Sequence, residues 1–193
     1  DGLLRPVKGV LPLVKKAEEK GFTGVILPKG NGKEASFIKN ISVYEASTLA
    51  DVADHVSGAV EIVPFPKNAD EQHTELSYDF DMQDIRGQDH AKRALVIAAA
   101  GGHNIGLSGP PGTGKTFFAR ALPSILPPLS FDEALEVTTI HSVAGILRGS
   151  FLRERPFRSP HHTSSYVSLV GGGAFPKPGE ITLAHRGVLF ADE

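Results

Sequence analysis

An eight-residue glycine-rich motif constrains this chain of 193 residues more than any other feature. The motif reads Gly109-Pro110-Pro111-Gly112-Thr113-Gly114-Lys115-Thr116. Glycines let consecutive backbone N–H groups curl around an anion, and a helix that follows points its positive end at the same anion. Such a loop works where a short buried strand turns into a helix. The motif therefore predicts a phosphate-binding loop in an α/β fold.

Two side chains of this loop have predicted roles in binding ATP and Mg²⁺. Lys115 is expected to reach the β and γ phosphates as a point charge, and the Thr116 hydroxyl to take one position on Mg²⁺. A chance match to the motif is the alternative. The neighbouring sequence favours a nucleotide site, because residues 104–108 predict a short buried strand and residues 117–122 a helix.

The last seven residues, 187–193, form an apolar run that ends in two acids. The run predicts a buried parallel strand whose carboxyl end delivers both carboxylates to a ligand-binding crevice. Asp192 is expected to hold Mg²⁺, and Glu193 to orient and polarise an attacking water, so Glu193 and Lys115 are the predicted catalytic residues. A solvated acidic turn is the alternative, which the upstream loop makes less favourable.

Elements alternate along the rest of the chain. We predict helices over residues 12–20, 31–39, 47–56 (capped by Ser47 or Thr48) and 89–100, and strands over 24–28, 41–45 and 137–142. The alternation predicts a small α/β domain over residues 1–66 with parallel strands. Residues 67–84 are polar and acidic and are predicted to be a linker. Residues 85–193 form the predicted second domain.

Basic and aromatic residues are concentrated between residues 147 and 163. They are Arg148, Arg153, Arg155, Arg158, His161 and His162, with Phe151 and Phe157 between them. Such a mixture can follow a nucleic-acid backbone and stack on bases. A solvated basic loop, or arginines that meet a neighbouring subunit, are equally compatible with the sequence. We take Arg153, Arg155 and Arg158 as candidate nucleic-acid contacts.

A glycine- and proline-rich stretch over residues 171–180 predicts a β-hairpin tip. The Pro178-Gly179 pair favours a type II turn, after which residues 180–183 are expected to return as a strand. Lys177 on this tip is a fourth candidate for contact with DNA. An inert turn is the alternative, which the sequence alone favours.

Composition sets further limits. The chain has no cysteine, so disulfides and thiolate metal sites are excluded. Its longest apolar run, residues 94–102, is about half the length of a membrane span. No membrane association is expected, and the cytoplasm is the predicted location. Met82 is the only methionine, so we expect residues to precede Asp1 in the natural protein.

Several runs carry a resemblance to a known family. They are Asp84-Ile-Arg-Gly-Gln88, Ala91-Lys-Arg-Ala-Leu95, Ala98-Ala-Ala-Gly-Gly-His-Asn104, the glycine-rich loop, Arg155-Pro-Phe-Arg-Ser-Pro-His-His-Thr163 and Ala184-His-Arg-Gly-Val-Leu-Phe190. The chain resembles the YifB/ComM family of magnesium-chelatase-like AAA+ ATPases over nearly all of its length. The run at 155–163 is the most specific of these. The resemblance implies a truncated three-layer αβα P-loop core in residues 85–193, a hexameric ring in the full-length protein, and DNA branch migration during natural transformation.

The first 66 residues resemble the tail of a Lon-type protease domain, through Gly24-Val-Ile-Leu-Pro-Lys29. In that protease a lysine follows shortly after Gly-Gly-Leu. Here the matching stretch is Gly9-Val10-Leu11, and Leu11 stands where the lysine would fall. The region of the protease serine is absent from the chain. Proteolysis is therefore expected to be lost.

Three functions remain open on this sequence. The first is an ATP-driven DNA-remodelling ring, the second the ATPase motor of a magnesium-chelatase-type metal insertion complex, and the third a non-catalytic, nucleotide-gated assembly module. Ring ATPases also need an arginine finger and a sensor residue, which would lie beyond Glu193. The chain by itself is thus expected to be inactive or nearly so.

Overall fold

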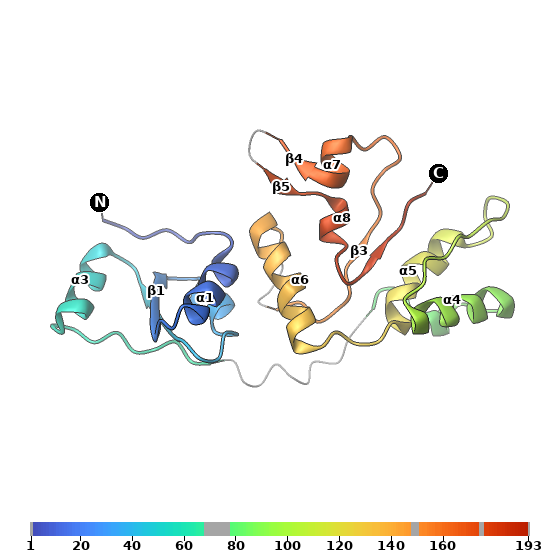
Figure 1. Cartoon of the computed structure of the whole chain (residues 1–193). Helices are drawn as coiled ribbons and strands as arrows, with labels where there is room; N and C mark the ends of the chain where they lie inside the picture. The colour runs from blue at the N-terminus through green and yellow to red at the C-terminus, as the bar shows by residue number, and fades with distance from the viewer. Residues whose placement is uncertain (1, 68–77, 148–150, 174–175, 193) are drawn as a thin grey trace. The chain divides into compact units, whose positions relative to one another are not determined.

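The computed structural model describes residues 2–67, 78–147, 151–173 and 176–192 (Figure 1). The chain divides into two compact units, one of residues 1–74 and 138–151 and the other of residues 75–137 and 152–193. Both contain helices and a pair of parallel strands, which confirms the predicted α/β class.

The first unit is built on two parallel strands. Strand β1 (Gly24–Pro28) pairs with β2 (Ser42–Ala46), and Gly24 lies opposite Ser42. Parallel neighbours require a crossover connection, which here contains the short helix α2 (Gly32–Ala35). The predicted strands are confirmed to within one residue at each end, whereas α2 is shorter than the predicted helix over 31–39.

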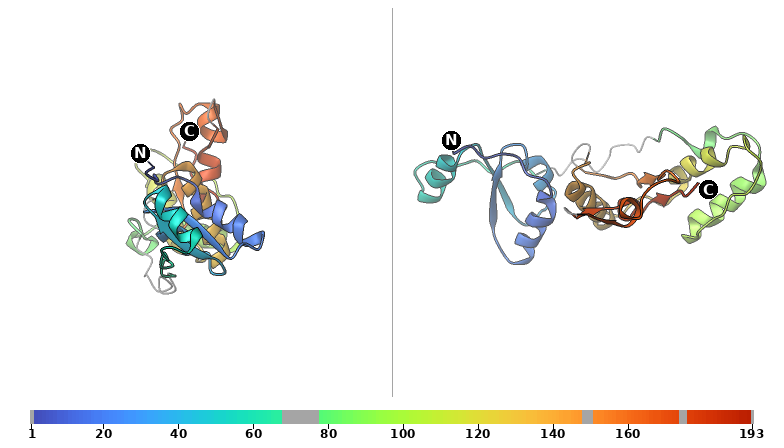
Figure 2. Two further views of the ribbon diagram at one scale, coloured as in Figure 1. Left: turned by 90° about the vertical axis from the view of Figure 1, so that its left-hand side faces the viewer. Right: turned by 90° about the horizontal axis from the view of Figure 1, so that it is seen from above.

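Helix α1 (Val10–Glu19) supplies much of the core of the first unit and lies beside the strand pair in Figure 2. Val10, Leu11 and Val14 are its buried residues, and Leu11 has no exposed surface. Leu11, which the sequence predicts to stand in place of a protease lysine, is thus a fully buried apolar side chain.

Helix α3 (Leu49–Ser57) begins with a reciprocal cap. The Thr48 hydroxyl accepts a hydrogen bond from the backbone N–H of Asp51, and the Asp51 carboxylate accepts one from the N–H of Thr48 at 2.8 Å. This arrangement satisfies donors that every helix start leaves open. Thr48 is therefore the cap, one of the two residues predicted.

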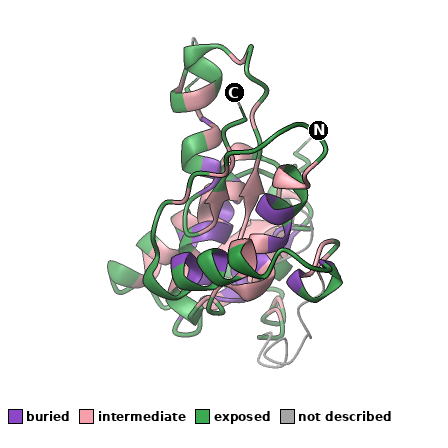
Figure 3. Ribbon diagram, turned by 90° about the vertical axis from the view of Figure 1, so that its right-hand side faces the viewer, coloured by how far each residue is buried: buried purple, intermediate pink, exposed green. Residues whose placement is uncertain are grey.

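The second unit packs helices α4 (Asp89–Gly101) and α5 (Lys115–Ile125) with the 3₁₀ turn η2 (Met82–Asp84). The buried apolar side chains of these elements and of Ile85 form one cluster, made of Met82, Ile85, Leu95, Phe118 and Ala121. Figure 3 shows by colour which parts of the ribbon are buried. Helix α4 confirms the prediction over 89–100. Met82 lies in the segment predicted to be a linker, so part of that segment belongs to the packed structure.

The strand predicted over residues 137–142 is wrong, because these residues lie in helix α6 (Phe131–Ala144). Their β-branched side chains suggested a strand. The burial of Ala134, Val137, Thr138 and Ser142 instead follows helical spacing. Ser130 and Glu133 form a reciprocal cap, in which each backbone N–H donates to the other side chain. This Ser-x-x-Glu pattern was readable in the sequence.

The predicted hairpin is confirmed only in its first part. Strand β4 (Gly171–Gly172) pairs antiparallel with β5 (Lys177–Pro178), but residues 180–183 form helix α8 (Glu180–Leu183) and not a returning strand. The predicted type II turn is also wrong, since Gly179 has φ −85° and caps α8. A Cβ at this position would lie 2.4 Å from Gly171 N, so only glycine permits the approach.

Helix α7 (Tyr166–Val170) precedes β4, and strand β3 (Phe157–Arg158) pairs in parallel with β6 (Val188–Leu189). Strand β6 is shorter than the predicted strand over 187–193. Residues 104–108 are not assigned to a strand and form no backbone hydrogen bond with any described residue. Their burial nevertheless alternates, because Ile105 and Leu107 pack against the apolar cluster while their neighbours are exposed.

Leu11→Ala should lower the free energy of unfolding of the first unit by about 3 kcal/mol, because it leaves a cavity in a fully buried site. Leu13→Ala is the matched control on the same helix, since Leu13 is 65% exposed and its truncation should cost less than about 0.5 kcal/mol. Urea denaturation followed by circular dichroism measures both. Equal losses in the two variants would contradict the assigned core.

Candidate phosphate-binding site

The glycine-rich loop ends directly at helix α5. Gly112 and Gly114 have φ of 79° and 83°, the left-handed region that favours glycine, and Gly114 is the residue before the first helical one. A Cβ added at either glycine would meet no atom within 4 Å. The space beside the loop is thus open at both positions, and backbone conformation is what requires glycine there.

The backbone donors of the loop are unused. Within the described part of the chain, no atom accepts a hydrogen bond from the N–H groups of residues 112–117, and no side chain caps α5. The first intrahelical bond is the one from Phe118 N to Gly114 O, at 2.9 Å. Helix starts leave such donors open, and the partial positive charge of the helix end lies at the same place. The loop therefore presents a row of donors suited to an anion.

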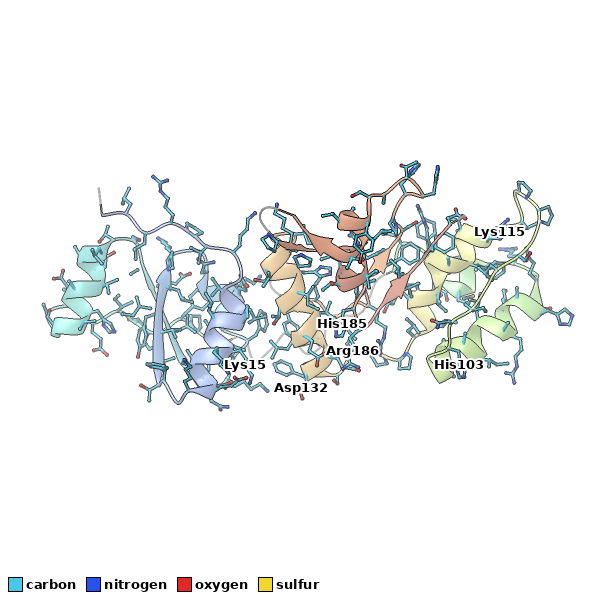
Figure 4. The ribbon with its side chains drawn as sticks, turned by 45° about the horizontal axis from the view of Figure 1, so that its top comes forward. Lys15, His103, Lys115, Asp132, His185 and Arg186 are labelled. Atoms are coloured by element: carbon cyan, nitrogen blue, oxygen red, sulfur yellow. The ribbon has the colours of Figure 1, made fainter. Side chains whose placement is uncertain are left out.

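The carbonyl groups of the same loop are occupied by side chains of the loop itself. Lys115 Nζ donates to Gly109 O at 2.7 Å and to Pro110 O at 3.1 Å. The Thr113 hydroxyl also donates to Pro110 O, at 2.9 Å. The ammonium group of Lys115 is therefore held at the loop, where Figure 4 labels it. The predicted placement of a positive charge beside the open amides is consistent with this geometry.

Gln88 is a contact of the loop that the sequence analysis did not single out. Its side-chain amide donates to Thr113 O at 3.0 Å. Gln88 has φ 55°, which is uncommon outside glycine and costs about 1 kcal/mol or more. It precedes α4, so the contact joins the start of that helix to the loop. Its position at the end of the Asp84–Gln88 run was the only available signal.

The donor chemistry fits a nucleotide with Mg²⁺. Thr116 is exposed in the first turn of α5, and the exposed Asp192 follows β6. A hydroxyl and a carboxylate are the hard oxygen ligands that Mg²⁺ prefers. No hydrogen bond or ion pair within the described residues joins Asp192 to the loop, so these two ligands remain a prediction. Glu193 lies outside the described residues.

Strand β6 is held against β3 by two further backbone bonds. Val188 N donates to Pro156 O and Phe190 N to Arg158 O, both at 2.8 Å. The rings of Phe157 and Phe190 stack with centroids 6.2 Å apart. The segment that leads to Asp192 is therefore fixed to the arginine-rich run that contains β3.

The turn before β6 is fixed by charge. Arg186 has φ 60°, and its guanidinium pairs with Glu136 at 3.0 Å and Glu133 at 3.2 Å, both from α6. His185 Nε2 lies 3.1 Å from the same Glu136 carboxylate (Figure 4). Hydrogen bonds from Arg186 and His185 lower the pKa of Glu136. The ion pairs thus link the turn that contains this left-handed residue to α6.

The four candidate nucleic-acid contacts lie in different environments. Arg158 makes a two-pronged pair with Glu180, from Nε to Oε2 at 2.5 Å and from Nη2 to Oε1 at 2.7 Å. Arg155 donates to two backbone carbonyls, and Arg153 is half-buried. Lys177 on β5 is exposed. Arg155 and Arg158 thus have partners inside the chain, and contact with a nucleic acid stays a prediction for all four.

Two other features follow from the described residues. None of their helices is both long and apolar enough to cross a membrane. They also contain no group of three or more His, Asp or Glu side chains arranged to hold a metal ion. The rings of the adjacent His161 and His162 lie with centroids 4.1 Å apart, and His161 Nδ1 lies 2.7 Å from the Thr163 hydroxyl.

Comparison with known proteins gives a consistent result. The family described as "Magnesium chelatase, subunit ChlI" matches residues 81–193. The whole chain is 45% identical to the competence protein ComM of Haemophilus influenzae, 43% to the protein YifB of Escherichia coli and 44% to the protein Rv2897c of Mycobacterium tuberculosis. The chain spans only 37 to 38% of the length of these relatives.

Glu180→Gln should make stability less dependent on pH. The hydrogen bond from Arg158 lowers the pKa of Glu180 below its usual 4.5, so the pair stabilises the fold above that pH and the contribution is lost as the pH falls through the lowered pKa. The variant should unfold more easily by about 1 kcal/mol at pH 7, and this difference should shrink as the pH is lowered from 7 through the lowered pKa of Glu180.

Thermal unfolding across this pH range measures the difference between the two proteins. Glu19→Gln is the control, because it removes an exposed pair with Lys16 and should leave stability nearly unchanged. A gap between Glu180→Gln and the parent that persists unchanged at the lowest pH would exclude the ion pair as its source.

Proposed function

We propose, since the chain belongs to the family of the magnesium chelatase subunit ChlI, that it is part of an AAA+ ATPase that binds and hydrolyses ATP. One observation carries the proposal. Consecutive backbone N–H groups over residues 112–117 are without an acceptor among the described residues, and they lie at the start of α5 beside the Lys115 ammonium. This combination favours a polyphosphate over any uncharged ligand.

The residues of the site have distinct proposed roles. Residues 112–117 donate to the phosphates through their backbone N–H groups. Lys115 leaves the Gly109 and Pro110 carbonyls to pair with the β and γ phosphates. Thr116 and Asp192 hold Mg²⁺, which would neutralise charge on the phosphate oxygens. Glu193 orients and polarises the attacking water. Hydrolysis in a ring additionally requires residues from elsewhere in the protein.

A P-loop AAA+ core is the proposed fold of residues 85–193. The alternating burial over 104–108, directly before the loop, is that of a strand with unused hydrogen-bonding groups. Strand β6 is parallel to β3 and is followed by Asp192, the acid expected at the end of such a neighbour. We propose that both join one sheet in the full-length protein. Residues 1–66 are then the remnant of a Lon-like domain, in which the buried Leu11 is incompatible with a catalytic lysine.

The proposed biological role is DNA remodelling by a hexameric ring in the cytoplasm. It rests on the likeness to ComM, a competence protein by name, and on the basic residues of 153–177. Lys177 is the strongest candidate for DNA contact, because it is exposed on a hairpin whereas Arg155 and Arg158 are engaged internally. The ATPase motor of a metal insertion complex is the second candidate, supported by the family match.

Lys115→Ala in a full-length protein that carries this segment should weaken ATP binding about 30-fold or more, since it removes charge-assisted bonds to phosphate. Titration with a fluorescent ATP analogue measures the affinity. Lys177→Ala is the matched control and should bind ATP like the parent, because Lys177 lies outside the loop. Equal affinity in the parent and Lys115→Ala would overturn the assignment of the nucleotide site.

ATP hydrolysis by the same full-length protein should rise several-fold with branched or single-stranded DNA. Lys177→Ala should reduce this rise more at low salt than at high salt, because a phosphate contact contributes less to binding as the salt concentration increases. Glu193→Gln should keep ATP binding and stop hydrolysis. Steady-state phosphate release measures all three proteins. Hydrolysis that is unchanged by every DNA tested excludes the DNA motor, and a rise only with a chelatase partner supports the metal insertion complex.

A further inference from the structure

Arg155 bridges two backbone carbonyls that are 59 positions apart in the sequence. Its Nε donates to Pro127 O at 2.6 Å, and its Nη1 donates to Arg186 O at 2.5 Å. A guanidinium group is planar and always charged, so it can direct two N–H groups at two fixed acceptors. An ammonium group has no such fork. The contact is therefore specific to arginine in its geometry.

The two carbonyls belong to the two halves of the proposed nucleotide site. Pro127 follows the end of α5 by two residues, and α5 starts at the phosphate loop. Arg186 opens the turn into β6, and the chain continues from β6 to Asp192. Arg155 thus ties the far end of the loop helix to the beginning of the strand that carries the metal-binding acid.

Helix α5 and the segment from Arg186 to Asp192, which Arg155 connects, have similar lengths. The 11 residues of α5 rise by about 16 Å at 1.5 Å per residue. An extended chain from Arg186 to Asp192 spans about 20 Å at 3.3 Å per residue. Arg155 fixes the end of α5 and the start of this segment relative to each other. A change at Arg155 is therefore expected to shift Asp192 relative to Lys115 and Thr116.

The turn at Arg186 can transmit this constraint because it has little freedom. The Arg186 side chain is paired with Glu133 and Glu136, and its backbone is left-handed. A Cβ at the next residue, Gly187, would lie 2.0 Å from the Pro156 carbonyl oxygen. A shift of the Arg186 carbonyl is therefore expected to move the start of β6, because the backbone at Arg186 and Gly187 has little conformational freedom.

We propose that Arg155 is a positioning residue for the Mg²⁺ carboxylate, through its tie between α5 and β6. The inference rests on the proposed nucleotide function and assigns to Arg155 a role other than contact with DNA. Its removal should leave the phosphate loop intact, because none of the loop bonds involves it. It should instead misplace Asp192 and weaken only the part of ATP binding that depends on Mg²⁺.

The experiment compares ATP affinity in Mg²⁺ and in EDTA for a full-length protein that carries this segment. In EDTA, Arg155→Met should bind ATP within about twofold of the parent, whereas the gain on adding Mg²⁺ should fall about tenfold, as in Asp192→Asn. The double variant should lose no more than either single variant, because both changes remove one interaction. Arg155→Lys should recover part of the gain by reaching one of the two carbonyls.

Arg158→Met is the matched control from the same sequence run. It breaks the pair with Glu180 but leaves the two hydrogen bonds of Arg155. It should therefore lower thermal stability and keep the increase in ATP affinity that Mg²⁺ produces. The proposal is overturned when Arg155→Met keeps the parental gain, loses affinity equally in Mg²⁺ and EDTA, or adds its loss to that of Asp192→Asn. A parent that binds no ATP in either condition would instead overturn the proposed function itself.

Discussion

The left-handed turn at Gly114 is the constraint on which the site depends. It converts the loop into α5 within one residue and leaves the first amides of the helix without internal acceptors. A side-chain cap would have satisfied some of these donors, as Thr48 does at α3 and Ser130 at α6. Among the described α-helices, side chains cap α3, α6 and α7, whereas α5 has no side-chain cap, like α1, α2, α4 and α8. An unsatisfied helix start is a cost to folding that an anionic ligand can offset.

The sequence predicted the elements of the first unit well because their signals are local. Strands β1 and β2 are short apolar runs bounded by turn residues, and α3 has a cap and a terminal glycine. The prediction failed at residues 137–142, where β-branched side chains suggested a strand. Strand propensity reflects packing on a pleated surface more than a backbone preference, so the start signal at Ser130 was the better guide to α6.

The sequence predicted which residues form the candidate site, but not which contacts from other segments hold those residues in place. The loop and its lysine could be read directly, since each role follows from a residue type at a fixed spacing. The contacts of Gln88, Arg155 and Arg186 could not, because each joins segments that are distant in the sequence. Arginines near aromatic residues predict nucleic-acid contact only when their side chains are free. Here Arg155 and Arg158 both donate to acceptors within the chain, which the sequence did not indicate.

The limits of strand pairing explain why a side chain, that of Arg155, is proposed to connect the phosphate loop and Asp192. Residues 104–108 and β6 both have the burial pattern of strands, yet only β6 has a described neighbour, β3. A ladder of backbone bonds fixes the register of two strands, but it does not fix where a helix lies along them. That relation must come from side chains between the helix end and the strand start. Arg155 supplies it with two bonds to main-chain carbonyls, those of Pro127 and Arg186.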